Sequence, residues 1–179
     1  MSTPSRLVTW LVSAFLSATP ALAVEQAQAP RLGIPMSKEE IAKWDLTIFP
    51  DGRGLPPGHG TAKEGRPIYA DKCASCHGEK GEGATAEELV GEPAPPSAEN
   101  PSKAIGSYWP FAPTIFDFIR RSMPPAAPLS LSADEAYAVT AYLLAANKLI
   151  GQDDEMNAKT LPLIKMPNRD GFIWIDVKK

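Results

Sequence analysis

Residues 73–77 of the chain read Cys73-Ala74-Ser75-Cys76-His77. These five positions hold both cysteines and one of the two histidines of a 179-residue chain. Two thiols spaced in this way on a helix can form thioether bonds to the two vinyl groups of one haem, and the adjacent imidazole then reaches the iron. The motif therefore predicts one covalent haem c, with Cys73 and Cys76 as attachment points and His77 as an axial ligand.

Two other uses of a C-x-x-C pair fit the chain less well. A thioredoxin-like redox pair lies in a βαβ unit, whereas the capping residues of this sequence predict helices. A zinc half-site would need further ligands, and the chain has no other cysteine. Because the haem uses both thiols, a cysteine-ligated haem iron and a cysteine-bound sulfur intermediate are not available.

The sixth iron ligand has to come from another part of the chain. Met123 lies in the stretch RRSMPP (residues 120–125), where a rigid loop after a helix can hold its sulfur over the opposite haem face. Met123 as ordinary core packing is the alternative, and Met166, His59 and water are alternative ligands. An iron with His and Met ligands is coordinatively saturated, so this pattern predicts electron transfer.

Helix starts are indicated by four capping boxes, in which a Ser or Thr is followed three positions later by Glu. They are Ser37 with Glu40, Thr61 with Glu64, Thr85 with Glu88, and Ser132 with Glu135. Pro113 suits the first turn of a helix over 114–122, which Pro124 and Pro125 end. Apolar residues recur at three and four residue steps from Ala136, which predicts a long last helix that continues to Gly151.

Irregular segments separate these helices. The chain has 19 prolines, about twice the usual share. Residues 50–60 and 92–101 are rich in proline and glycine, so neither is expected to form a strand. Residues 166–175 combine a turn signal with apolar residues, which predicts a tail laid across the domain.

The N-terminus indicates where the protein is located, and the charge balance indicates which kind of partner is excluded. Residues 1–23 have a basic start, an apolar run over 7–18 and the small residues Ala21 and Ala23, as in a cleaved secretory signal. The apolar run is short for a membrane span, so an uncleaved anchor is the weaker reading. The chain has 18 basic and 21 acidic residues without a long basic run, which disfavours nucleic-acid binding.

Gly65 and Tyr69 precede the motif, a Met-Pro pair follows it, and Tyr142 lies on the predicted last helix. This spacing resembles class I cytochrome c. The resemblance implies an all-α fold, a small helical bundle around one haem with loop-rich N- and C-terminal extensions. Glycine lacks a Cβ, so Gly65 would let the last helix approach closely, against Tyr142 and Leu143.

Five longer stretches carry a more specific pattern: Ile41–Pro57, Tyr69–Gly83, Ile105–Pro124, Leu129–Asn147 and Met166–Phe172. They resemble the cytochrome c subunit of Sox sulfane dehydrogenase and related sulfite dehydrogenase cytochromes. The resemblance implies a periplasmic subunit that takes electrons from a molybdenum-cofactor subunit oxidising a sulfur compound and passes them to another cytochrome or an oxidase. It implies haem attachment at Cys73 and Cys76 and axial ligation by His77 and Met123. We also expect no catalytic residue in the chain and no stable membrane span after signal cleavage.

The same resemblance places the haem pocket wall at residues 106–110, with Tyr108 and Trp109. Arg120 and Arg121 are candidate partners of the haem propionates, although a basic pair near a helix C-terminus also favours the helix dipole. Three tryptophans have two possible roles: they either pack inside the domain or contact a partner protein. They are Trp44, Trp109 and Trp174.

The sequence thus predicts four parts: a signal peptide (1–23), an N-terminal extension (24–60), a cytochrome c domain (61–150) and a packed C-terminal tail (151–179). Two other functions stay open. A free periplasmic shuttle cytochrome would serve several dehydrogenases, and a haem-based ligand sensor would need a labile sixth site. The extensions favour the subunit, because a minimal shuttle does not need them.

Overall fold

The computed structural model describes residues 32–91 and 102–172. The predicted signal peptide, the irregular segment 92–101 and Trp174 lie outside these ranges. The chain divides into a unit that ends at Met36 and a unit that runs from Ser37. All helices and strands of the described residues lie in the second unit.

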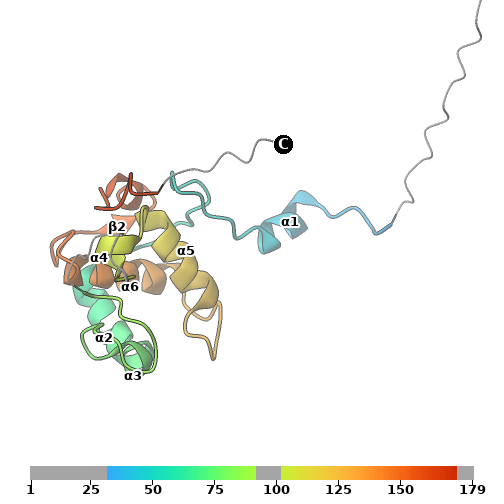
Figure 1. The fold of residues 1–179 in the computed structure, drawn as a ribbon. Helices are drawn as coiled ribbons and strands as arrows, with labels where there is room; N and C mark the ends of the chain where they lie inside the picture. The colour runs from blue at the N-terminus through green and yellow to red at the C-terminus, as the bar shows by residue number, and fades with distance from the viewer. Residues whose placement is uncertain (1–31, 92–101, 173–179) are drawn as a thin grey trace, which may run out of the picture. The chain divides into compact units, whose positions relative to one another are not determined.

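The described residues form a mostly helical structure, so the predicted all-α class is confirmed (Figure 1). Its helices are α1 (Lys38–Trp44), α2 (Ala62–Lys72), α3 (Ala74–His77), α4 (Ile105–Tyr108), α5 (Ala112–Ser122), α6 (Ala133–Ala146) and the 3-10 helix η1 (Leu161–Leu163). Two short strands, β1 (His59–Gly60) and β2 (Met156–Asn157), pair antiparallel. No helix in the described ranges is long and apolar enough to cross a membrane.

Three of the four predicted capping boxes are confirmed, at the starts of α1, α2 and α6. The helix predicted from Thr85 and Glu88 is wrong, because residues 85–90 are not helical. Their backbone bonds to an earlier segment instead. The Ala86 amide donates to the Cys76 carbonyl, and the amides of residues 89 and 90 donate to the Gly81 carbonyl.

Two boundaries also differ from the prediction. Residues 59–60 were expected to be irregular, but they form β1, opposite Met156 and Asn157. A Cβ on Gly60 would lie 2.5 Å from the Ala138 amide nitrogen, so glycine at this position lets β1 lie directly against α6. The last helix ends at Ala146 and not near Gly151, because Lys148 adopts a positive φ of 62° that breaks the helical backbone.

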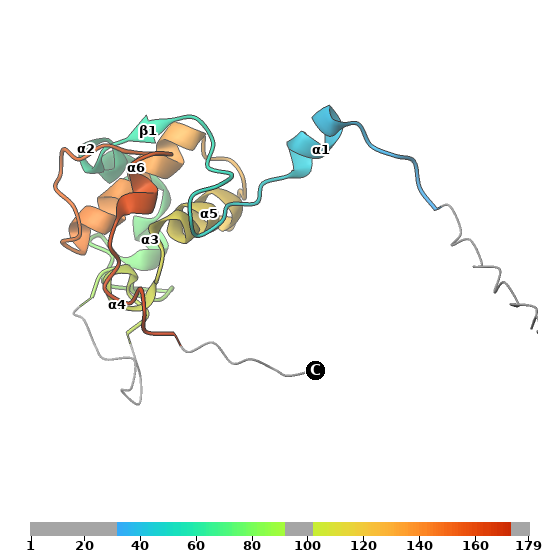
Figure 2. The same cartoon turned by 90° about the horizontal axis from the view of Figure 1, so that it is seen from above.

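The core forms where α6 lies between α2 and α5 (Figure 2). A Cβ on Gly65 would overlap the Ala138 carbonyl and come within 2.9 Å of the Tyr142 Cβ. The predicted close approach of the last helix at Gly65 is therefore confirmed, with Ala138 as the nearest residue. Tyr69 of α2 packs on Tyr142 at 4.8 Å between ring centroids.

The chain after α6 contributes to the same core. Leu161 and Met166 are both buried. The Asn168 side-chain amide donates to the Tyr108 carbonyl at 2.7 Å, and the Arg169 guanidinium lies over the Phe111 ring. These contacts hold residues 161–169 against α4 and the start of α5.

Candidate haem site

Four of the sequence-predicted residues meet at one cavity of about 520 Å³. Cys73, Cys76, His77 and Met123 all line it. The first three come from α3 and its N-cap, and Met123 comes from the C-cap of α5. The volume lies within the usual range of cofactor sites.

The two cysteines are presented by a single helical turn. Cys73 ends α2 and begins α3, and its carbonyl accepts hydrogen bonds from the amides of Cys76 and His77 at 3.1 and 3.0 Å. Both thiols are free. Burial raises the pKa of the Cys73 thiol to about 11, against the smaller opposing effect of Lys72. The attacking thiol of a redox-active pair has a lowered pKa, and Cys73 does not have this property.

The imidazole of His77 is oriented by the backbone of a neighbouring loop. Its Nδ1 lies 2.8 Å from the Glu87 carbonyl oxygen. Because a carbonyl oxygen only accepts hydrogen bonds, Nδ1 carries the proton and Nε2 keeps a free lone pair. Such a contact is the usual way in which proteins orient a metal-binding histidine. This role of Glu87 has no signal in the sequence, because the local pattern at residues 85–88 predicts a helix start and any residue type can supply a backbone carbonyl.

Met123 is positioned by the end of α5. Its amide donates to the Ile119 carbonyl at 3.0 Å, and Pro124 and Pro125, which follow it, also line the cavity. Of the described methionines, only Met123 lines the cavity. Met166, the alternative ligand, lies buried in the core and not on the cavity wall.

The rest of the cavity wall is largely apolar. It includes Leu89, Ile119, Val139 and Leu143. Tyr69, which the sequence did not predict as a wall residue, also lines it, and its hydroxyl donates to the Gly78 carbonyl at 2.9 Å. Burial raises the pKa of Tyr69 above its usual range, so the phenol stays neutral. Two thiols, an imidazole, a thioether and an apolar surround are the chemistry that fits haem c.

Comparisons with known proteins agree with this geometry. A family model described as cytochrome C oxidase, cbb3-type, subunit III matches residues 60–143. The crystal structure of the sulfane dehydrogenase SoxCD from Paracoccus pantotrophus matches at 40% identity and a TM-score of 0.77, over 83% of this chain and 73% of that chain. The chain belongs to the c-type cytochromes. Haem c and electron transfer follow from this membership, and the resemblance to sulfane dehydrogenase is confirmed. No curated protein matches.

Four other candidate residues of the cytochrome do not line the cavity: Tyr108, Trp109, Arg120 and Arg121. Trp109 packs edge-to-face on Phe118, with 5.8 Å between the ring centroids. The Arg121 guanidinium donates to the Asp117 carboxylate at 2.6 Å and to the Leu46 carbonyl at 2.9 Å. Arg120 and Arg121 line a separate small hollow beside Leu46. The structure therefore gives Arg121 a contact with the N-terminal extension in place of a position on the cavity wall.

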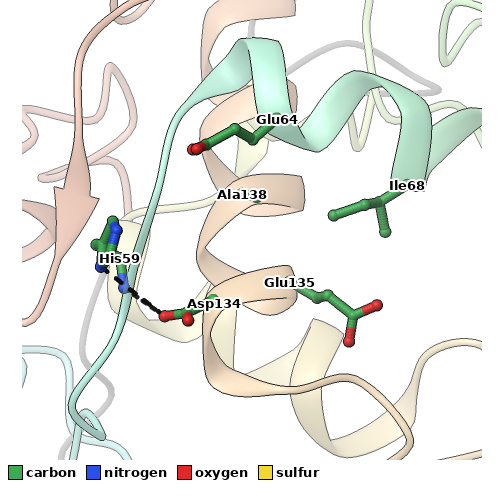
Figure 3. Close-up of a pocket in the computed structure, with 6 residues that line it drawn as sticks. All are labelled: His59, Glu64, Ile68, Asp134, Glu135 and Ala138. Atoms are coloured by element: carbon green, nitrogen blue, oxygen red, sulfur yellow. Dashed lines mark hydrogen bonds and ion pairs between the residues drawn. The ribbon is translucent and has the colours of Figure 1, made fainter.

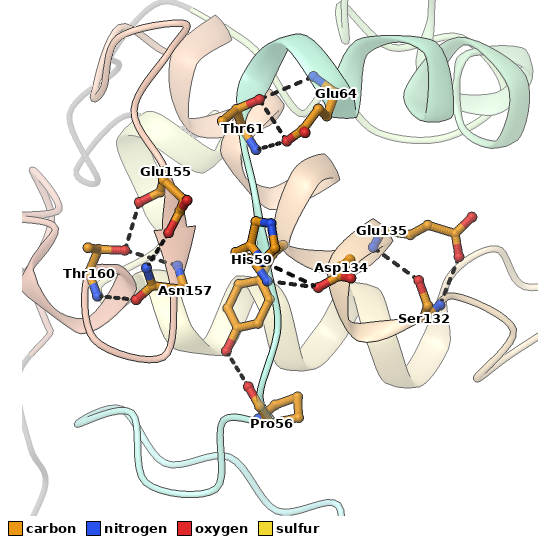
Figure 4. A network of polar contacts seen from close by, with 11 residues as sticks. Pro56, His59, Thr61, Glu64, Ser132, Asp134, Glu135, Glu155, Asn157 and Thr160 are labelled. Carbon is orange, nitrogen blue, oxygen red and sulfur yellow. Dashed lines mark hydrogen bonds and ion pairs between the residues drawn. The ribbon is translucent and has the colours of Figure 1, made fainter.

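His59, the other alternative iron ligand, lies in a different hollow (Figure 3). Its backbone amide donates to the Asp134 carboxylate at 2.8 Å. The neighbouring carboxylates of Glu64 and Glu135 accept from the amides of Thr61 and Ser132 and complete capping boxes (Figure 4). Among the described residues, no group of three or more acidic, histidine or cysteine side chains is arranged to hold a metal ion.

Proposed function

We propose that this cytochrome is the electron-transfer subunit of a periplasmic, molybdenum-dependent sulfite or sulfane dehydrogenase. It takes electrons from the molybdenum subunit and passes them to a downstream cytochrome or oxidase. The observation that carries the proposal is the match to the sulfane dehydrogenase SoxCD at 40% identity over 73% of that chain. In this proposal the chain itself holds no catalytic residue.

The proposed site assigns one haem c to the chain. Cys73 and Cys76 hold it covalently, and His77 and Met123 supply the axial ligands. When bound, haem c gains and releases one electron at its iron. The Glu87 carbonyl keeps the His77 ring in one orientation and one tautomer. Leu89, Ile119, Val139 and Leu143 exclude water, and a low-polarity surround of this kind helps to set the reduction potential.

We expect the chain to have four parts. Residues 1–23 direct export and are removed, residues 61–150 form the haem domain, and residues 24–60 and 151–179 extend it. The position of Met123 on the cavity wall argues against a haem-based ligand sensor, because a sensor needs an open or labile sixth site.

Purification from the native periplasm tests the partner. The untagged protein is separated by size-exclusion chromatography, and each fraction is assayed for haem absorbance, molybdenum and sulfur-compound oxidation. We expect haem and molybdenum to coelute above the size of one chain, and sulfite or a sulfane donor to reduce the haem in those fractions. Haem that elutes alone as a monomer, and that no sulfur donor reduces, would favour the free shuttle cytochrome instead.

A further inference from the structure

Helix α1 carries an apolar face that the described residues leave largely exposed. Ile41 and Trp44 lie three residues apart, so they share one side of the helix. Ile41 is 49% exposed and Trp44 is 78% exposed, and α1 buries none of its residues. A complete capping box between Ser37 and Glu40 fixes the start of the helix. An ordered helix of this kind, with exposed large apolar residues, is suited to a partner that binds a helix face in a groove.

The chain directly after α1 is fastened to the haem domain. Ile48 is buried in the core, and the Leu46 carbonyl accepts the hydrogen bond from Arg121 of α5. Asp117, one turn earlier on α5, holds the same guanidinium. The segment 46–48, which forms the base of α1, is therefore held in a fixed position on the haem domain.

This base adjoins the loop that bears Met123. Leu46, Arg121 and Leu129 line one small hollow, and Leu129 is 53% exposed. The same loop, residues 123–130, contributes Met123 and Pro125 to the haem cavity. A protein bound at the base of α1 would consequently lie beside the rim of the haem site.

The charges of α1 indicate what kind of partner fits. The helix has two lysines and two glutamates, and so no net charge. A helix that binds anionic lipid needs an excess of basic residues on its polar face, as does a segment that binds nucleic acid. A protein groove with an apolar floor is the better match.

The comparison with the solved structure extends into this region. Residues 60–179 amount to 120 positions, so an alignment over 83% of the 179-residue chain must include at least about 29 residues before residue 60. The N-terminal extension is thus largely shared with a sulfane dehydrogenase, although the family model that defines the haem domain begins only at residue 60.

We propose that the Ile41 and Trp44 face of α1 docks into an apolar groove of the molybdenum subunit and holds it beside the Met123 loop. This inference rests on the function proposed above. In this proposal the N-terminal extension makes the stable contact with the molybdenum subunit, and the haem domain does not need to make a stable contact of its own.

Binding of the holo-cytochrome to the molybdenum dehydrogenase identified in the fractionation tests the proposal. The variant Ile41→Ser/Trp44→Ser removes the apolar face. The control Glu39→Ala/Lys43→Ala changes two exposed residues on the opposite side of the same helix and keeps the net charge. Affinity is measured by titration, and the absorbance spectrum and the rate of reduction by ascorbate are recorded for each protein.

We expect the apolar-face variant to bind at least tenfold more weakly than the wild type, with an unchanged spectrum and unchanged ascorbate reduction. The control should bind like the wild type. Equal affinity of the apolar-face variant would overturn the docking inference and leave the proposed function intact. A wild-type cytochrome that binds no molybdenum protein would overturn the proposed function itself. Self-association of the wild type that the variant abolishes would identify a second copy as the occupant and overturn the inference.

Discussion

The thioether of Met123 is the side chain on which the sixth iron position depends in the proposed site. Met123→Ala should remove the weak red absorption band of sulfur-to-iron ligation from the oxidised spectrum. It should also lower the reduction potential, by on the order of 0.1 V within the range of about 0.8 V that axial ligands span. Spectroscopy and redox titration of the holoprotein measure both effects. An unchanged band would exclude Met123 as the ligand.

Met166→Ala is the matched comparison, because Met166 is the alternative ligand and is buried in the core. This variant should keep the red band. It should lose about 2–5 kcal/mol of unfolding free energy, because truncation leaves a cavity in packed surroundings. Denaturant unfolding measures the loss. A loss of the band with retained stability would reverse the assignments of the two methionines.

The candidate haem-binding residues could be named from the sequence because the chemistry of haem attachment fixes their spacing. Two thioether bonds and one axial ligand need the five consecutive residues 73–77, so the motif is visible without any tertiary information. The contact of Glu87 with His77 was not visible, since it uses a backbone carbonyl and any residue type could provide it. Arg121 was placed near the haem on charge alone, whereas the structure pairs it with Asp117 and Leu46.

At the scale of elements, the crossing of α2 and α6 depends on the missing side chain of Gly65. In the Gly65→Ala variant the new methyl group would overlap the Ala138 carbonyl, so the two helices must move apart. We expect a loss of about 1–3 kcal/mol in the free energy of unfolding, as is typical of overpacking. The exposed neighbour Arg66, changed to alanine, should have little effect. Equal stability of both variants would show that the helices do not need this close contact.

The capping box at the start of α6 should make stability depend on pH. Hydrogen bonds from the Ser132 amide and hydroxyl lower the pKa of Glu135 below its usual value. A carboxylate with a lowered folded-state pKa stabilises the fold above its unfolded pKa of about 4.3, and this contribution is lost as the pH falls through the folded value. Glu135→Gln should therefore be less stable than the wild type at pH 6, and the difference should shrink towards pH 3. Parallel unfolding curves over this range would contradict the prediction.

The elements that could be predicted are those with local causes. Capping boxes and Pro113 marked the starts of α1, α2, α5 and α6, because a cap satisfies amides of its own helix. The same local pattern at Thr85 failed, since the backbone of residues 86–90 already bonds to Cys76 and Gly81. Strand β1 was missed for a related reason. Its partner β2 lies almost a hundred residues later in the chain, and no local signal records such a pairing.

For the molecule as a whole, the cavity lined by Cys73, Cys76, His77 and Met123 lies against the helical core. Ile119 of α5 and Val139 and Leu143 of α6 form part of its apolar wall. A haem held there, as proposed, would pack against these side chains as part of the core.

Cys73→Ala/Cys76→Ala should accordingly abolish covalent haem and prevent stable folding. Circular dichroism and denaturing gels stained for covalent haem measure the two effects. Cys73→Ser/Cys76→Ser serves as a comparison, because it keeps a similar side-chain volume while it removes the thioethers. A folded, haem-free protein with a cooperative unfolding transition would show that the polypeptide core suffices.

The hydrogen bond between His77 and the Glu87 carbonyl also bears on the speed of electron transfer. The loop that carries Glu87 is tied to α3 through the bond between the amide of Ala86 and the carbonyl of Cys76, so the imidazole cannot turn without breaking its hydrogen bond to a fixed backbone carbonyl. The rate at which an electron moves depends on how far atoms must rearrange when the charge of the site changes. A ligand that is held in place in this way keeps that rearrangement small, so we expect distance and driving force to govern the exchange with a partner.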